Sequence, residues 1–419
     1  MQTLYIFNAI ITNDAVVLGL LVALLGFIFF TTSSGSRFWV RFYKVVPSLL
    51  LCYFVPSLFN STGIIDGEKS QLYPVISRYI LPVSLVLFTI SIDFAALKRL
   101  GPKALIIFLS GSVGIVLGGP LAVLLFSWIS PETVGGHGPE AVWRGLTTIA
   151  GSWIGGSANQ AAMKEVFNVG DKVFSAMITI DVIVANLWMA VLLYGAGISK
   201  KVDKMLRADD SDIETLKEKL ETFQKENTRV PTTSDLMMIF GVGFGAMGLS
   251  HWLADRIAPF IANHAPYLEQ FSLTSSFFWV VLLATTIGML LSLTRARYLE
   301  GVGASKIGSV LLYVLVASVG MKMDVLAILD NPGLFGLGLF WMLFHGFVML
   351  STAKLLKAPF FFVAVGSQAN VGGAASAPIV ASAFSPALAP VGVLLAVLGY
   401  ALGTYGGYIC GLMMQAMAP

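Results

Sequence analysis

Long apolar segments recur along the whole 419-residue chain, and they restrict it to very few kinds of fold. A helix of about 20 apolar residues is long enough to cross the hydrocarbon core of a bilayer. Charged residues make up only 12% of the chain, against about 25% in soluble domains. The sequence therefore predicts an all-α polytopic membrane protein. Its twelve apolar segments lie at 8–31, 39–59, 72–97, 103–128, 143–167, 172–197, 234–258, 274–294, 302–328, 333–353, 358–384 and 388–416.

Several function classes lack their sequence signals. The chain has no GxxxxGK[ST] phosphate-binding loop, so an ATP-driven pump is not indicated. Cys52 and Cys410 lie inside apolar segments and form no metal or disulfide pattern. The Lys and Arg residues sit at segment ends, which does not favour a nucleic-acid surface. We expect no enzyme and no cofactor, and we interpret residues 8–31 as a retained span because no basic stretch precedes it.

Two of the apolar segments, 143–167 and 358–384, have centres rich in Gly, Ala, Ser and Asn. Helix is poorly favoured by such sequences. Backbone without helical pairing is tolerated at membrane depth only inside the protein or along a watery cavity. We therefore expect two re-entrant or broken helical elements, and a further ten helices that cross the membrane.

The two halves of the chain resemble each other. GGSANQAAMKEVF (155–167) aligns without gaps with GGAASAPIVASAF (372–384), and DFAALKRLGP (93–102) resembles DVLAILDNP (324–332). The order of these features is the same in both halves, which indicates an internal duplication. The predicted organisation is a first transmembrane repeat at 1–198, a charged cytoplasmic linker with a short surface helix at 199–232, and a second transmembrane repeat at 233–419.

The positions of Lys and Arg favour one topology. If both Gly-rich elements are re-entrant, each half crosses five times, the halves are inverted, and most of the 26 Lys and Arg residues face the cytoplasm. If both elements cross, this bias largely disappears. We expect a 5+5 inverted repeat with both termini outside the cytoplasm; the alternative is a broken helix that crosses fully.

The polar groups of the two elements suggest a binding site. Helix N-termini inside a membrane offer unpaired N–H groups to a carboxylate, while unwound carbonyls and hydroxyls suit Na⁺. Glycines elsewhere, such as the Gly399, Gly403, Gly407 and Gly411 stripe and the Gly241 and Gly245 pair, are interpreted as helix-packing positions. The candidate substrate-binding residues are Gly155, Gly156, Ser157, Asn159, Gln160, Gln368, Asn370, Gly372, Gly373 and Ser376.

Asp181 is an acidic residue inside the apolar run MITIDVIVANLWMA, where a carboxylate is costly. We interpret it as an ion ligand or proton carrier; the alternative is a structural partner for a nearby Lys or Arg. Asn186, Ser152 and Ser367 complete the candidate ion-coupling set, for Na⁺ or H⁺, and no other metal site is expected. His251 and His345 are interpreted as buried, hydrogen-bonded side chains.

The segments LTTIAGSWIGGSANQAAMKEVF (146–167), TIDVIVAN (179–186) and VGSQANVGGAASAPIVASAF (365–384) carry a family resemblance. The chain resembles the bacterial membrane family called domain of unknown function 819. GSWIGGSAN is also similar to the Gly-Gly elements of glutamate:sodium and citrate:sodium symporters, which are grouped with bile-acid:sodium symporters and cation/proton antiporters. The resemblance implies a core domain with crossed broken elements, a scaffold domain, a homodimer, elevator-like movement and a bacterial inner-membrane location.

These observations predict a secondary active transporter, a Na⁺-coupled symporter of a small organic anion or amino acid. Its expected partners are that small-molecule substrate, the lipid bilayer and a second copy of the chain. The alternative is a cation/proton antiporter that uses Asp181, although the double-Asp signature of such antiporters is absent there. An ion channel is the more remote alternative.

Overall fold

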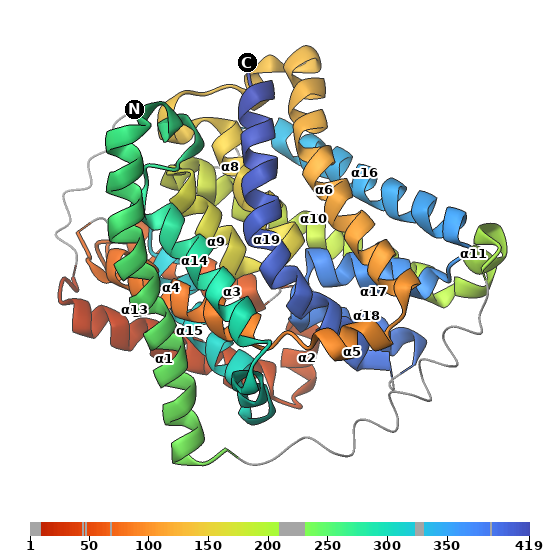
Figure 1. Cartoon of the computed structure of the whole chain (residues 1–419), viewed down its shortest axis with the longest axis horizontal. Coiled ribbons are helices and arrows are strands. Elements are labelled where there is room, and N and C mark those ends of the chain that lie inside the picture. Colours follow the sequence, from red (N-terminus) through yellow and green to blue (C-terminus); the bar gives the residue numbers. More distant parts are fainter. Residues whose placement is uncertain are drawn as a thin grey trace.

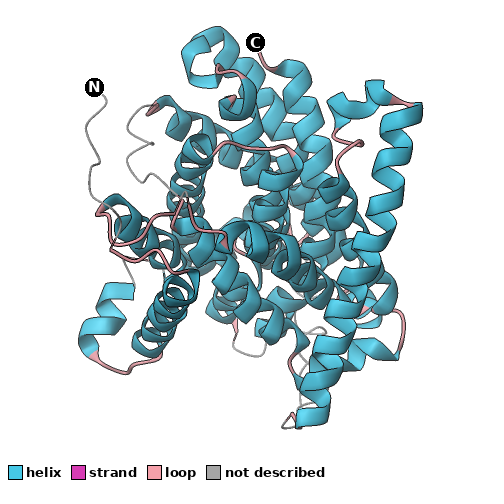
Figure 2. Ribbon diagram, turned by 90° about the vertical axis from the view of Figure 1, so that its left-hand side faces the viewer, coloured by secondary structure: helices cyan, strands magenta, loops and turns pink. Residues whose placement is uncertain are grey.

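The computed structural model describes residues 10–43, 46, 48–67, 69–208, 231–322, 331–385 and 388–419. Within these ranges the chain is built from helices and contains no strand (Figure 2). All twelve predicted apolar segments coincide with a helix or with a pair of consecutive helices. The protein is therefore an all-helical polytopic membrane protein.

Among the described residues, seven helices are long and apolar enough to cross a membrane. Three further predicted spans contain helices of fewer than 18 residues: α3 (Ser48–Ser61), α14 (Ser276–Leu291) and α15 (Ala304–Gly320). α14 is followed by the 3-10 helix η3 (Arg295–Val302) after a bend of 94°. The ten-crossing count stays a prediction because of these short helices. The seven long helices are α1 (Asp14–Thr32), α4 (Leu72–Ile90), α6 (Pro102–Ile129), α10 (Asp171–Gly197), α13 (Thr233–His264), α16 (Gly333–Leu356) and α19 (Ala389–Met417).

Both Gly-rich segments are broken helices. The first consists of α8 (Val142–Gly155) and α9 (Ser157–Val166), and the second of α17 (Phe360–Val371) and α18 (Gly373–Phe384). Gly156 has φ 77° and Gly373 has φ 62°. Side chains other than glycine rarely adopt such backbone angles, so each glycine allows the chain to leave one helix and start another.

The remaining described elements are short. They are α2 (Arg37–Tyr43), α5 (Phe94–Arg99), α7 (Pro131–Val134), α11 (Ser199–Leu206) and the 3-10 helices η1 (Gly138–Glu140) and η2 (Pro266–Phe271). Of the predicted linker, α11 is described, whereas residues 209–230 and Asp324 of the second repeat lie outside the described residues.

The helices pack in two groups, and α13, α1 and α3 of one group lie to the left of α19 in Figure 1, whereas α6, α16 and α17 of the other lie to its right. We call α1, α3, α4, α13, α14 and α15 the α4 group, and α6, α8, α9, α10 and α16–α19 the α19 group. Each half of the chain contributes helices to these two groups in the same order. Three helices enter the α4 group, and then a long helix, a broken helix and a second long helix enter the α19 group. The two groups meet where α9 and α19 contact α4 and α14.

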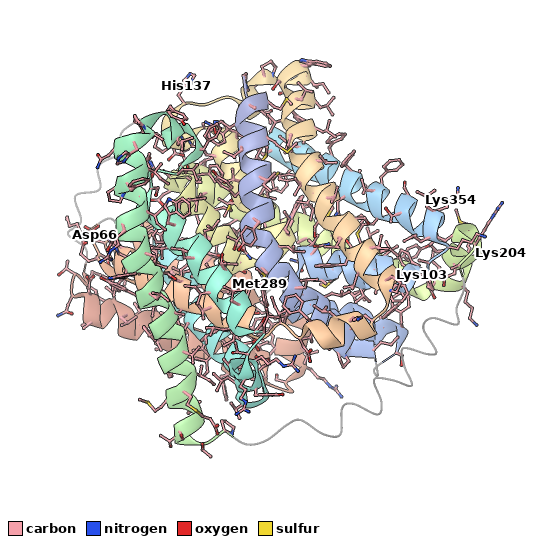
Figure 3. The ribbon with its side chains drawn as sticks, viewed as in Figure 1. Asp66, Lys103, His137, Lys204, Met289 and Lys354 are labelled. Carbon is pink, nitrogen blue, oxygen red and sulfur yellow. The ribbon has the colours of Figure 1, made fainter. Side chains whose placement is uncertain are left out.

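Three basic residues from α6, α11 and α16 lie in the same part of the molecule. Lys103, Lys204 and Lys354, which the charge pattern assigns to the cytoplasmic side, all lie near α11 in Figure 3, far from His137. That this part faces the cytoplasm stays a prediction.

The glycine stripe of α19 packs closely against the first broken helix. A Cβ built at Gly403 would lie 2.6 Å from the Cα of Gly155 and 2.6 Å from the Nδ2 atom of Asn159. By contrast, no described atom lies within 4 Å of a Cβ built at Gly241 or Gly245. The packing interpretation therefore holds for α19, but within this chain it is wrong for those two glycines of α13.

We expect Gly403→Val to destabilise the protein by about 1–3 kcal/mol, because overpacking forces neighbouring backbone to move. Gly241→Val, in an open position of another long helix, is the matched control and should leave stability nearly unchanged. Thermal unfolding of the purified proteins in detergent measures both. Equal stability of the two variants would contradict the close packing at Gly403.

Candidate functional site

The two broken helices approach each other beside α19. A Cβ built at Gly399 of α19 would lie 2.8 Å from the carbonyl oxygen of Ile154 in α8 and 3.7 Å from that of Ala369 in α17. Helices α8 and α17 also contact each other directly. The two interruptions of the helical backbone are therefore neighbours inside the α19 group, although more than 200 residues separate them in the sequence.

Asp181 of α10 bonds to both parts of the first broken helix. Its carboxylate accepts hydrogen bonds from Ser152 Oγ (2.6 Å) and Trp153 Nε1 (2.7 Å) in α8, and from Gln160 Nε2 (2.9 Å) in α9. The residue is only 7% exposed. All three donors are neutral, and no Lys or Arg of the described chain forms an ion pair with it. The alternative interpretation, in which Asp181 forms a structural ion pair, therefore has no support among the described residues.

Asn159 connects the first broken helix to α19. Its amide nitrogen donates to the carbonyl oxygens of Gly155 (2.8 Å) and Tyr400 (2.9 Å), and its amide oxygen accepts from Thr404 Oγ1 (2.7 Å). Thr404 in turn lies 3.0 Å from the hydroxyl of Thr285 in α14. The buried amide is thus engaged on both sides, and it fixes the position of α9 relative to α19.

The second broken helix is fastened by a buried histidine. His345 Nδ1 lies 2.9 Å from the Gly111 carbonyl oxygen, and Nε2 lies 2.8 Å from Ser367 Oγ, which also accepts from Trp188 Nε1 (2.7 Å). Because a carbonyl only accepts, Nδ1 carries the proton, and Ser367 donates to Nε2 of a neutral ring. The expectation of a hydrogen-bonded buried histidine agrees with this geometry. His251, in contrast, is not buried, although one ring nitrogen lies 3.0 Å from the Arg78 carbonyl oxygen.

Asn370 adds a second attachment to α6. Its amide oxygen accepts from Ser112 Oγ (2.8 Å), and its amide nitrogen donates to the Phe108 carbonyl oxygen (3.1 Å). Two residues earlier, Gln368 donates from Nε2 to Ser376 Oγ (2.7 Å) and so connects α17 to α18 across the break. The second broken helix is therefore held by α6, α10 and α16 on its buried side.

The predicted site residues fall into buried and accessible sets. Asn159, Gln160, Ser367 and Asn370 are buried and bonded within the protein, and Gly155 and Gly373 are buried as well. Asn186 donates to the Val182 carbonyl within its own helix (2.6 Å) and does not join the Asp181 cluster. The accessible predicted residues at the two breaks are Gly156, Ser157, Gly372 and Ser376.

Several residues of the site were not predicted. Tyr400 lies near both breaks: its ring is 3.4 Å from a Cβ built at Gly156, and its hydroxyl lies near the backbone of Ala374 in α18. Trp153, Trp188 and Ser112 bond to Asp181, Ser367 and Asn370. A polar atom on a Trp or Tyr within an apolar span requires a partner, and that signal was available in the sequence.

A second polar cluster connects the two helix groups at the end of α9. Lys164 Nζ is 2.7 Å from Asp171 Oδ1 and 3.1 Å from the hydroxyl of Tyr73 in α4, and that hydroxyl also bonds to Glu165. Lys164 is only 6% exposed and lies 4.4 Å from the centre of the Tyr73 ring. We call Tyr73, Lys164, Glu165 and Asp171 the α4–α9 latch. Beside it, a cavity of about 470 Å³ is lined by Glu165, Arg144, Glu269 and their neighbours.

Comparison with known proteins agrees with a membrane protein of this kind. The chain is 23% identical over 392 residues to the uncharacterized membrane protein YjcL of Bacillus subtilis strain 168, and the match covers 90% of this chain and 92% of that protein. Residues 19–417 match the model of a protein family that is described as a protein of unknown function. This match spans nearly the whole chain, so the protein belongs to the DUF819 family.

Proposed function

We propose that the protein is a secondary active transporter that couples the movement of a small organic anion or amino acid to the movement of a cation. Na⁺ is the first candidate for this cation, and H⁺ is the second. The observation that carries this proposal is the environment of Asp181. It is a buried carboxylate inside a membrane helix, bonded by neutral groups only, at a break in the neighbouring helix. We propose no enzymatic activity and no cofactor other than the coupling ion.

In this proposal, the geometry around Asp181 allows ion binding to affect substrate binding. An unneutralised carboxylate at membrane depth is costly, so a Na⁺ or a proton that binds there is favoured by electrostatics. The carboxylate touches Ser152 and Trp153 before the break and Gln160 after it. A change in its charge therefore alters the bonds that hold α8 and α9 in their relative positions.

The substrate in this proposal occupies the accessible side of the two breaks. The first turns of α9 and α18 present N–H groups there, next to Ser157 and Ser376. Helix N-termini favour negative charge, and in membrane transporters they commonly face the anionic group of a substrate. The buried Asn159 and Asn370 then act by holding each break in shape.

The division into two helix groups supports an elevator-like movement. In this proposal the α19 group is the moving core and the α4 group is the scaffold, which a second copy of the chain extends in a homodimer at the bacterial inner membrane. Each half contributes helices to the two groups in the same order, which supports the internal duplication on which the proposed 5+5 inverted repeat rests. The α4–α9 latch joins the core to the scaffold and must open when the core moves.

A cation/proton antiporter is the second candidate, because the same Asp181 carboxylate is able to exchange Na⁺ for H⁺. Purified protein in liposomes distinguishes the two functions. A change of internal pH after addition of Na⁺ without any organic solute indicates the antiporter. Uptake of an organic solute that depends on a Na⁺ gradient indicates the symporter, and neither activity would contradict both.

We expect Asp181→Asn to abolish cation-driven uptake in liposomes, because the amide keeps the shape of the carboxylate but not its charge. Asn186→Ala is the control on the same helix, since within the described residues Asn186 bonds only to the Val182 carbonyl of its own helix; it should retain uptake. Size-exclusion profiles and thermal unfolding establish that both variants are folded. Normal Na⁺-dependent kinetics in Asp181→Asn would exclude Asp181 as the coupling residue.

We expect Tyr73→Phe to speed the opening of the α4–α9 latch by about tenfold, because it removes a hydroxyl that bonds to two charged side chains but keeps the ring beside Lys164. The measurement is the rate at which a membrane-impermeant maleimide labels a cysteine introduced by Ser157→Cys. Tyr79→Phe, an exposed position on the same helix, is the control. An unchanged labelling rate in Tyr73→Phe would show that the latch does not limit access.

A further inference from the structure

Gln368 contains the one buried side-chain polar atom that lacks a hydrogen-bond partner in the described part of the chain. This atom is the amide oxygen Oε1, on a side chain that is only 2% exposed. Buried polar groups are almost always paired, so an unpaired acceptor next to an accessible surface indicates a partner that arrives from outside the protein. The amide nitrogen of the same residue is already engaged with Ser376.

The unpaired oxygen belongs to the break of the second element. Gln368 lies on the last turn of α17, and its amide spans the break to reach Ser376 on the first turn of α18, a helix of 12 residues. A Cβ built at Gly372 would clash with the Gln368 amide and with the Ser376 hydroxyl. The glycine thus leaves room for the amide at the start of α18.

The polar atoms at this place form a recognisable pattern. Ser376 Oγ accepts from Gln368 Nε2, which leaves its own O–H proton available to donate to a ligand. The first N–H groups of α18 favour an anionic group. One acceptor, Gln368 Oε1, therefore lies close to two kinds of donor, the Ser376 hydroxyl and the first N–H groups of α18. This arrangement is complementary to a carboxylate that carries a hydrogen-bond donor on the adjacent carbon.

We infer that the transported substrate is an α-amino or α-hydroxy carboxylate, whose carboxylate binds at the start of α18 and whose ammonium or hydroxyl group donates to Gln368 Oε1. The inference rests on the proposed transport function and narrows it. A simple carboxylate satisfies the donors but leaves the amide oxygen unpaired, and it is for this reason the weaker ligand. Sites that hydrogen-bond a polar group on a substrate discriminate strongly against analogues that lack this group.

The test compares ligands that differ only at the adjacent carbon. Two series are suitable: alanine and lactate against propionate, and aspartate and malate against succinate. Thermal shift of the purified full-length protein in Na⁺ measures binding, and competition for uptake in liposomes measures transport. In at least one series, we expect the donor-bearing members to bind about tenfold more tightly than the member without a donor.

Gln368→Met removes the amide while keeping a side chain of similar length. We expect this variant to lose the tenfold preference and to bind all members of a series with the affinity that the wild type shows for the member without a donor. Gln71→Met, at an exposed glutamine before α4, is the control and should keep the preference. Thermal unfolding without ligand establishes that Gln368→Met is folded, and Gln368→Glu serves as a second variant if it is not.

The outcomes separate this inference from the proposed function. Na⁺-dependent uptake with equal affinity for members with and without a donor would overturn the inference and leave the transporter intact. A preference for the members without a donor would also overturn it, because it requires the Gln368 amide to present its nitrogen to the ligand. Gradient-driven transport of no carboxylate in either series, and of no other organic solute, would overturn the proposed function itself.

Discussion

The structure depends on one constraint, which is that a peptide group in hydrocarbon must have a hydrogen-bond partner. Two interruptions of helix inside a membrane protein violate this rule unless other groups replace the lost bonds. At the first break the Asn159 amide supplies such a replacement, because it donates to the Gly155 carbonyl oxygen. Asp181, His345 and Asn370 instead bind the side chains and neighbouring helices around the two breaks together. The polar groups that distinguish this chain from an ordinary bundle therefore have two tasks. Most of them hold unusual backbone in place, and a smaller number face the accessible side.

The two breaks are supported in different ways. The first is held by a carboxylate that bonds to three neutral donors, so its geometry depends on one group that is able to change its charge. The second is held by a neutral imidazole and by amide–hydroxyl contacts. The two halves differ here in sequence, because no acidic residue lies in α19, the helix that follows the second element. The first break is thus held in part by a group that can carry charge, and the second by neutral groups.

Sequence reasoning predicted the helical segments well, because long apolar runs and Gly-Gly pairs have direct physical consequences for backbone in lipid. It also selected Asp181, Ser152 and Gln160, which the structure brings together. It did not foresee that Asn159 and Asn370 are consumed by internal bonds, or that Asn186 bonds only within its helix. Tyr400 and Trp153 were missed as well. Such details depend on which helices become neighbours, and periodicity within one segment carries no information about that.

The mixed origin of the two helix groups has a consequence for biosynthesis. Neither group is complete until helices from both halves have been made, since α4 packs against α14 and α15, and α8 packs against α19. A nascent chain that has emerged only as far as α10 exposes Asp181 and the first broken helix without α17 and α19 to cover them. In such a chain this carboxylate and the first broken helix stay uncovered until the last helix is inserted. Truncation near the C-terminus should therefore be far more damaging to assembly than the loss of one helix from an ordinary bundle.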